Sequence, residues 1–402
     1  MLKHPNNTES YHFFDYASTT PCCPEAVELL QKYSCEDYGN PSSEHILGQQ
    51  SAKAIKISRR FFADYFKISP EQVIFTGSGS ESDNLAIYGV VLAAMAKKTS
   101  PIRVLTSATE HPAVRKTAQS LSSLGVDVQL IPVDGEGQIQ KEKFLELLTP
   151  HTLLVSIHQV NNIAGSLLPV EELASLAKSK VPGLIFHTDA VQAFGKISVP
   201  TSPSAVDLVS ISAHKIEGPK GVGALIVLNP SLLKSGLRPL IWGGEQEQGF
   251  RSGTQNAGLI AGFHAAAEKI LRDQKTHSLQ TTKLRERLWN SLKGKDLPIR
   301  WNSPKDLTKA VAHIVNLSIP GYPSGPLAKL LEERKCLVSL GSACSSHKAE
   351  PDSVLAAMGF PLPIQTSPLR ISFSGKQTVE EMDILIQALE DSIRQMKLLL
   401  GG

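Results

Sequence analysis

The sequence predicts an α/β protein built around a mainly parallel sheet, and both its internal pattern and its composition support this. From Val73 to about Val227, short apolar runs alternate with segments of helical pattern. Strands that alternate with crossover helices pair in parallel and carry helices on both faces. The 402 residues are 41% hydrophobic and 20% charged, which is typical of a globular protein with a large buried core.

The expected elements follow one another in a regular order. Strands are expected at VIF, VLT, VQLIPV, LLVSI, LIFHTD, DLVSIS and GALIVL, and helices at ESDNLAIYGVVLAAMAK and PAVRKTAQSLSSL. In such sheets ligands bind beyond the carboxyl ends of the strands. Polar residues that directly follow these runs are therefore candidate site residues.

A second domain is expected after a long helix. A helical pattern runs from about Gln255 to Leu292, and its polar middle suits a helix that leaves one domain and enters another. Beyond it we expect strands at AVAHIVNLSI and LRISFS, a helix at GPLAKLLEERK, and an amphipathic helix from Val379 to about Leu400. The expected division is a large domain over residues 15–265 and a smaller α+β domain over 1–14 and 266–402.

Charge and composition exclude several classes of function. Lys+Arg 41 against Asp+Glu 38 leaves a net charge of +3 without a long block of one sign, so nucleic acid is not an expected partner. The longest apolar run, Leu85 to Ala96, is too short to span a bilayer of about 30 Å. The amino terminus has neither a signal core nor a transit pattern, so a cytoplasmic location is expected. Five Cys residues without CxxC spacing predict neither a disulfide framework nor a metal site.

The segment FTGSGSES follows an expected strand and opens a helix. Its small residues allow backbone amides to approach an anion, and the helix N-terminus adds partial positive charge suited to a phosphate. Considered alone, an ordinary helix N-cap with flexible glycines explains this segment better.

Two further strand ends carry candidate groups. Asp189 ends the run LIFHTD and Gln192 follows three residues later, so the acid could hold a protonated ring nitrogen and the amide a ring oxygen. A helix N-cap by Asp189 is an equally good interpretation. Lys215 follows DLVSIS beside His214, where burial would favour a Schiff base with an aldehyde cofactor. The alternative is a solvated loop lysine.

The segment GSACSS places Cys344 among small, flexible residues. Such a loop can carry a mobile nucleophile, whereas a structural cysteine usually has bulky apolar neighbours, as Cys336 has in KCLVSL.

Taken together, the motifs resemble those of the pyridoxal-phosphate (PLP) cysteine desulfurases of the fold-type I, class V aminotransferase group. The matching segments span most of the chain in the family's order: Asp15-Tyr16, Thr19-Thr20-Pro21, Asn40-Pro41-Ser42-Ser43, FTGSGSESDNLAI, Thr109-Glu110-His111-Pro112, Asn161-Asn162, Asp189-Ala190-Val191-Gln192, Ser212-Ala213-His214-Lys215, Arg251-Ser252-Gly253-Thr254, GSACSS and Leu369-Arg370-Ile371-Ser372. The resemblance implies fold type I, with a mainly parallel seven-stranded sheet in the large domain and PLP as cofactor.

The resemblance also implies roles for individual residues. Lys215 would form the Schiff base and move the substrate Cα proton, His111 would stack on the ring and assist proton transfer, and Cys344 would be the nucleophile. Arg370 would hold the substrate carboxylate, with Asn162 beside it. The implied cofactor-binding set is Gly79, Ser80, His111, Asn162, Asp189, Gln192, Ser212, His214, Lys215 and, from the second subunit of a homodimer, Thr254.

The implied reaction converts L-cysteine to L-alanine and passes sulfur, as a persulfide on Cys344, to acceptor or scaffold proteins. The spacing after Cys344 resembles the branch with the longer catalytic loop, linked to iron-sulfur cluster assembly and tRNA thiolation. The chain departs from the usual family pattern at Ile163, Gln248 and Glu245.

Three other functions stay open at this point. A selenocysteine lyase is the nearest alternative, because it would share the fold and the cofactor. The loop thiol argues against a simple transaminase, which would not use it. The joint presence of Lys215, His111, Cys344 and Arg370 argues against a non-catalytic scaffold.

Overall fold

The computed structural model describes residues 2–3, 10–340 and 351–399. Its main sheet has seven strands in the order β3-β9-β8-β7-β6-β4-β5, and the neighbours from β8 through β5 all pair in parallel. β9 pairs antiparallel with both β8 and β3. The predicted mainly parallel, seven-stranded α/β fold is therefore confirmed. The strands are β3 (Val73–Thr76), β4 (Arg103–Ser107), β5 (Asp127–Ile131), β6 (Thr152–Ser156), β7 (Ile185–Asp189), β8 (Leu208–Ser212) and β9 (Gly223–Val227).

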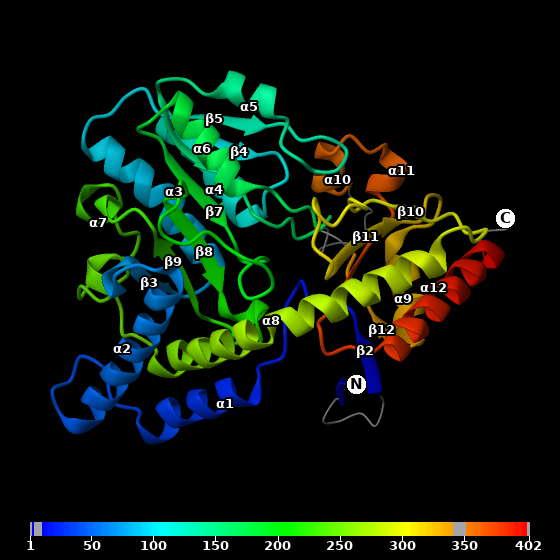
Figure 1. Cartoon of the computed structure of the whole chain (residues 1–402), viewed down its shortest axis with the longest axis horizontal. Helices are drawn as coiled ribbons and strands as arrows, with labels where there is room; N and C mark the ends of the chain where they lie inside the picture. The colour runs from blue at the N-terminus through cyan, green and yellow to red at the C-terminus, as the bar shows by residue number, and fades with distance from the viewer. Residues whose placement is uncertain (1, 4–9, 341–350, 400–402) are drawn as a thin grey trace.

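Both faces of this sheet are buried, because successive strand residues alternate between two apolar cores. Ile74 packs with α3 (Gly79–Ala96) and α4 (Pro112–Ser120), whereas Val73 and Phe75 pack on the other side. The second face is covered by α2 (Ile46–Phe66), α6 (Val170–Lys180) and the first part of α8 (Ala257–Leu292). α5 (Lys141–Leu147) lies beside β5, as Figure 1 shows.

A second region is built on short antiparallel strands. β10 (Arg300–Trp301), β11 (Ile314–Ser318) and β13 (Pro368–Ser372) form one sheet. β2 (Ser10–Phe13) joins β1 (Leu2–Lys3) to β12 (Cys336–Leu337) in another. A separate apolar core lies between these sheets, α9 (Ser324–Glu333) and α12 (Val379–Leu399). Smaller helices are α1 (Pro24–Gln31), α7 (Ser231–Ser235), α10 (Ser353–Ala357) and α11 (Leu362–Gln365).

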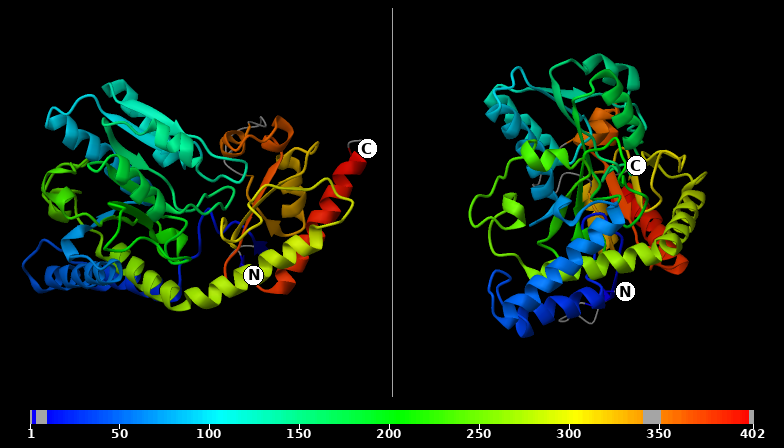
Figure 2. Two further views of the ribbon diagram at one scale, coloured as in Figure 1. Left: turned by 45° about the horizontal axis from the view of Figure 1, so that its top comes forward. Right: turned by 60° about the vertical axis from the view of Figure 1, so that its left-hand side comes forward.

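The 36-residue helix α8 links the two regions. Its first half packs on α1 and α2, and its second half packs on α12, so it runs from the main-sheet region into the second region, as Figures 1 and 2 show. The sequence prediction of a helix over about residues 255–292 agrees with its observed bounds. Among the described helices, none combines the length and apolar character needed to cross a membrane.

One departure from the family pattern coincides with an unusual backbone conformation. Glu245 is exposed and has a φ of 61°, in the left-handed region that suits glycine. We expect Glu245→Gly to raise the free energy of unfolding by up to about 1 kcal/mol, because relief of strain exceeds the added entropy of the unfolded chain. Urea unfolding measures this change.

Gly249, with a φ of 83°, supplies the matched control in the same loop. Gly249→Ala should destabilise the protein by about 1 kcal/mol, since alanine resists this conformation. A Glu245→Gly protein less stable than the parent would contradict the strain argument.

Candidate active site

A cavity of about 350 Å³ lies where the carboxyl ends of the main-sheet strands meet the second region. Most of the residues predicted to bind cofactor or substrate line it: Gly79, Ser80, His111, Asn162, Asp189, Gln192, Ser212, His214, Lys215 and Arg370. Thr254 is exposed and does not line this cavity. Cys344 lies outside the described residues.

Lys215 follows β8 in a single 3-10 turn, which directs its amine into the cavity. The Nζ atom donates to the carbonyl oxygens of Ala17 at 2.6 Å and Ser18 at 2.7 Å. Burial lowers the pKa of Lys215 to about 8, and the nearby charge of Arg370 acts in the same direction. The lysine therefore loses its proton far more readily than a solvated one.

The amino end of α3 forms one wall of the cavity through Ser78, Gly79 and Ser80. Gly79 is required there, because an added Cβ would lie 2.7 Å from Val191 Cγ2 and 3.2 Å from Ser212 Cβ. The Ser212 hydroxyl is buried and has no hydrogen-bond partner. A helix N-terminus and a free hydroxyl in one concave wall suit a phosphate group.

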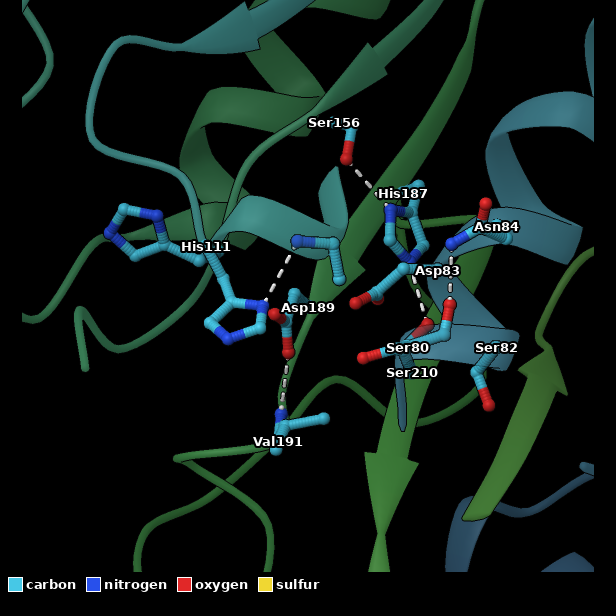
Figure 3. A network of polar contacts seen from close by, with 12 residues as sticks. Ser80, Ser82, Asp83, Asn84, His111, Ser156, His187, Asp189, Val191 and Ser210 are labelled. Carbon is cyan, nitrogen blue, oxygen red and sulfur yellow. Dashed lines mark hydrogen bonds and ion pairs between the residues drawn. The ribbon is translucent and has the colours of Figure 1, made fainter. Parts of the chain in front are cut away.

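Asp189 and His111 lie close together in the cavity wall, as Figure 3 shows. Asp189 Oδ1 accepts from the Val191 amide at 2.9 Å, and His111 Nδ1 accepts from the Ala113 amide at 3.1 Å. Burial raises the pKa of Asp189, and protonation of His111 would oppose that shift. Burial lowers the pKa of His111, so its ring is neutral over most of the physiological range.

Behind Asp189 lies a layer of fully buried polar side chains (Figure 3). His187 bridges Ser156 Oγ at 2.8 Å and Ser210 Oγ at 2.9 Å, and burial lowers its pKa to about 3. Asp83 Oδ1 is 3.7 Å from His187 Nε2, which is too long for a hydrogen bond. Burial and the charge of Asp189 raise the pKa of Asp83 well above its usual range, which favours the protonated form of Asp83.

Arg370 enters the cavity from β13, a strand of the second region. Its Nη1 donates to the Asn162 carbonyl oxygen at 2.9 Å, and its Nη2 donates to Asp15 Oδ1 at 2.7 Å and Ser18 Oγ at 2.6 Å. The guanidinium is almost fully buried, and Nε has no partner. A planar cation held in this way suits a carboxylate ligand.

We expect Arg370→Lys to raise KM for the amino-acid substrate about 10- to 100-fold, with a smaller change in kcat. The lysine keeps the charge but loses the planar fork, and one charge-assisted hydrogen bond contributes about 1.5–3 kcal/mol. Steady-state kinetics separate the two constants. An unchanged KM in a variant with wild-type thermal stability would exclude Arg370 as the carboxylate ligand.

Sequence reasoning assigned no role to Glu110 and His158, yet both are buried beside this site. His158 Nδ1 lies 2.9 Å from Glu110 Oε1, and His158 also lines the cavity. The signals in the sequence are that each residue follows a predicted strand by a few positions, and that Glu110 belongs to one of the segments that resemble the family. Within the described ranges, no group of three or more His, Cys, Asp or Glu residues could hold a metal ion.

The residues present fit PLP. The cavity wall offers an amine of lowered pKa, a buried acid for a ring nitrogen and a concave anion site. Several buried polar atoms at this wall have no partner among the described residues, which is expected where a polar ligand binds: Asp83 Oδ1, His158 Nε2, Ser212 Oγ and Arg370 Nε. The fold and this set of groups define a PLP-dependent enzyme of fold type I.

Comparison with known proteins leads to the same class. Residues 12–385 match the family model described as aminotransferase class-V. The chain is 34% identical to a cysteine desulfurase IscS of Clostridium botulinum, over 96% of this chain and 95% of the relative. It resembles the structure of a NifS-like protein with a TM-score of 0.87 and 31% identity, covering 96% of this chain and all of the other.

A structure described as SspA in complex with cysteine is also similar, with a TM-score of 0.78 and 31% identity, covering 91% of this chain and 100% of that one. The chain belongs to the class-V aminotransferase family, among its PLP-dependent cysteine desulfurases. The predicted family, fold type and cofactor are thereby confirmed.

Proposed function

We propose that the chain converts L-cysteine to L-alanine and transfers the sulfur, as a persulfide on Cys344, to acceptor proteins for iron-sulfur cluster assembly or tRNA thiolation. The observation that carries this proposal is that the Lys215 amine and the Arg370 guanidinium face one cavity. An amine that can capture an aldehyde cofactor thus shares a cavity with a cation that can hold an amino acid by its carboxylate. The proposed reaction follows the names of the similar proteins, which are cysteine desulfurases.

Bound PLP supplies an electron sink for carbanions formed at the substrate Cα. Asp189 would hold the ring nitrogen, Gln192 the ring hydroxyl, and Gly79, Ser80, Ser212 and His214 the phosphate. Arg370 and Asn162 would orient the substrate so that its Cα–H bond faces the Lys215 side of the cavity.

The lowered pKa values of Lys215 and His111 suit both side chains to proton transfer. With a pKa lowered to about 8, Lys215 can both accept and return a proton near neutral pH. His111, neutral and fixed by the Ala113 amide, has its Nε2 atom available for a second proton transfer. Overall, the Cys344 thiol gains one sulfur atom while cysteine becomes alanine.

The described residues that flank Cys344 support its assignment. Ser339 lines the cavity, and its Oγ accepts from Arg370 Nη2 at 3.2 Å. Cys344 follows five residues later, and five residues of extended chain span up to about 17 Å. The tether is therefore long enough for the thiol to reach a substrate on Arg370 and also to leave the cavity with sulfur.

We further propose a homodimer in which Thr254 completes the phosphate site of the partner. Thr254 is exposed and does not reach the cavity of its own chain. Trp242, 73% exposed, and Ile241, 41% exposed, lie in the preceding loop, and exposed apolar groups of this size are typical of subunit contacts. The core of the second region lies wholly within residues 1–14 and 266–402, which supports the proposed division from residues 15–265, although Val354, Leu355 and Met358 pack in the core of the main sheet instead. The free thiols of the described cysteines suit the proposed cytoplasmic location.

The test is product analysis on the purified protein with PLP. Incubation with L-cysteine should release alanine, and with a reductant sulfide, in equal amounts. Selenocysteine in a parallel reaction distinguishes the nearest alternative, and activity confined to selenocysteine would reject the proposal. A protein that binds no PLP and forms no alanine would instead be a scaffold.

A further inference from the structure

Gln192 and Lys196 lie on one side of the turn that follows β7. In this turn the Ile197 amide donates to the Ala193 carbonyl oxygen at 3.0 Å, which is the spacing of a helical turn. Side chains four residues apart meet in such a turn. Accordingly, Lys196 Nζ donates to Gln192 Oε1 at 3.2 Å.

Two contacts fix the orientation of the Gln192 amide, which is 5% exposed. Its Nε2 atom donates to the Ala17 carbonyl oxygen at 2.8 Å, and a carbonyl oxygen can only accept. Its Oε1 atom accepts from Lys196, and an ammonium group can only donate. Both contacts require the same orientation of the amide. With Oε1 engaged, the second N–H of Nε2 is the polar group that Gln192 can offer to a ligand.

This donor lies beside the Lys215 amine. The Ala17 carbonyl oxygen accepts from Lys215 Nζ at 2.6 Å as well as from Gln192 Nε2, so the two nitrogen atoms are neighbours. Lys215 and Gln192 both line the cavity of about 350 Å³. Lys196 does not line it, but borders a second cavity of about 70 Å³ that Lys215 also borders. Lys196 can therefore act on a ligand of the larger cavity through Gln192, without touching it.

The contact between Lys196 and Gln192 does not depend on the charge of the lysine. Burial lowers the pKa of Lys196 to about 7, and the charges of Lys215 and Arg370 act in the same direction. A neutral amine still carries N–H donors for Oε1. The Ala17 carbonyl oxygen continues to require Nε2, so the orientation of the amide is the same in both charge states.

We propose that Lys196 is a positioning residue for the cofactor: by engaging Gln192 Oε1, it presents the N–H donor of Gln192 to the ring hydroxyl oxygen of PLP. A donor at that position favours the ionised oxygen, whereas a rotated amide would present a lone pair and repel it. This inference deepens the proposed function and rests on PLP binding in this cavity with Gln192 at the ring hydroxyl.

The test uses two ligands that cannot bond covalently to Lys215. One is pyridoxamine 5′-phosphate, and the other is its deoxy analogue, with hydrogen in place of the ring hydroxyl. Equilibrium titration of the cofactor-free protein gives Kd for each. Lys196→Met keeps an unbranched side chain of similar length but removes the donor. It should raise Kd for pyridoxamine phosphate about three- to tenfold, the effect of one hydrogen bond, and leave Kd for the deoxy analogue unchanged.

Further variants make the test specific. Gln192→Ala should raise Kd for pyridoxamine phosphate at least as much, and adding Lys196→Met to it should change neither constant further, because Lys196 acts through the amide. Lys143→Met, at an exposed lysine, is the matched control and should alter neither constant.

Three results for Lys196→Met would overturn the inference: equal weakening of both ligands, unchanged binding of pyridoxamine phosphate, or an added loss in the Gln192→Ala background. The first would indicate a merely structural role. A Gln192→Ala protein with the wild-type preference for pyridoxamine phosphate over the deoxy analogue would overturn the inference by removing Gln192 from the ring hydroxyl. A wild-type protein that binds neither ligand would overturn the PLP site itself.

Discussion

Replacement of Lys215 by alanine is expected to abolish desulfuration, lowering kcat by more than about a thousandfold. In the described part of the chain no other lysine lines the cavity, so no second amine can take over covalent capture of the cofactor or transfer of the Cα proton. Alanine release from L-cysteine measures the loss. Borohydride treatment followed by mass analysis should link PLP to residue 215 in the wild type and leave the variant unlabelled.

The pH dependence of cofactor capture tests the same assignment in the wild type. Only the neutral amine attacks an aldehyde, and burial brings the pKa of Lys215 down to about 8 from its ordinary value of 10.5. The rate of covalent PLP uptake should therefore rise with pH and level off above about 8, followed by absorbance. A rate still rising steeply near pH 10 would indicate a solvated lysine. Borohydride labelling of Lys215→Ala to the wild-type extent would place the bond on another residue.

The main sheet could be predicted because its strands carry local signals. The run of β9, GALIV, is fully buried and has no polar side chain, and most residues of β8, LVSIS, are apolar. In the second region, β11 and β13 lie in apolar runs that also predicted strands, but the two-residue strands carry no such signal. β12 consists of Cys336 and Leu337, and it forms only through pairing with His12 and Phe13 from the other end of the chain. Pairing at that separation depends on tertiary contacts that no local pattern encodes.

The candidate site also has features that the sequence predicted and features that it did not. Lys215 and Asp189 stand at the ends of strands, where a chemical function is expected, and the family resemblance named their roles. The charge state of the site could not be read from the sequence. Asp83 lies within the helical pattern of α3, and its raised pKa depends on burial beside Asp189. The pairing of Glu110 with His158 depends on the adjacency of β4 and β6, which are separated in sequence by β5.

Cys344→Ser is expected to stop persulfide formation and alanine production from L-cysteine while the protein still binds PLP. A serine hydroxyl cannot accept the substrate sulfur, since transfer requires a thiolate. Lys215, Asp189 and Arg370 stay in place in this variant, so the absorbance of bound PLP should match that of the wild type. Intact-mass analysis after incubation with cysteine should find one added sulfur atom in the wild type and none in the variant.

Three of the other cysteines differ from the nucleophile that we propose. Burial raises the pKa of Cys336 to about 11 and also raises that of Cys23, so neither supplies a thiolate near neutral pH. Cys35 is exposed but does not line the cavity, which makes Cys35→Ser the matched control. It should retain full activity and the added sulfur. Full activity in Cys344→Ser, or a persulfide located by peptide mapping on another cysteine, would move the nucleophile away from position 344.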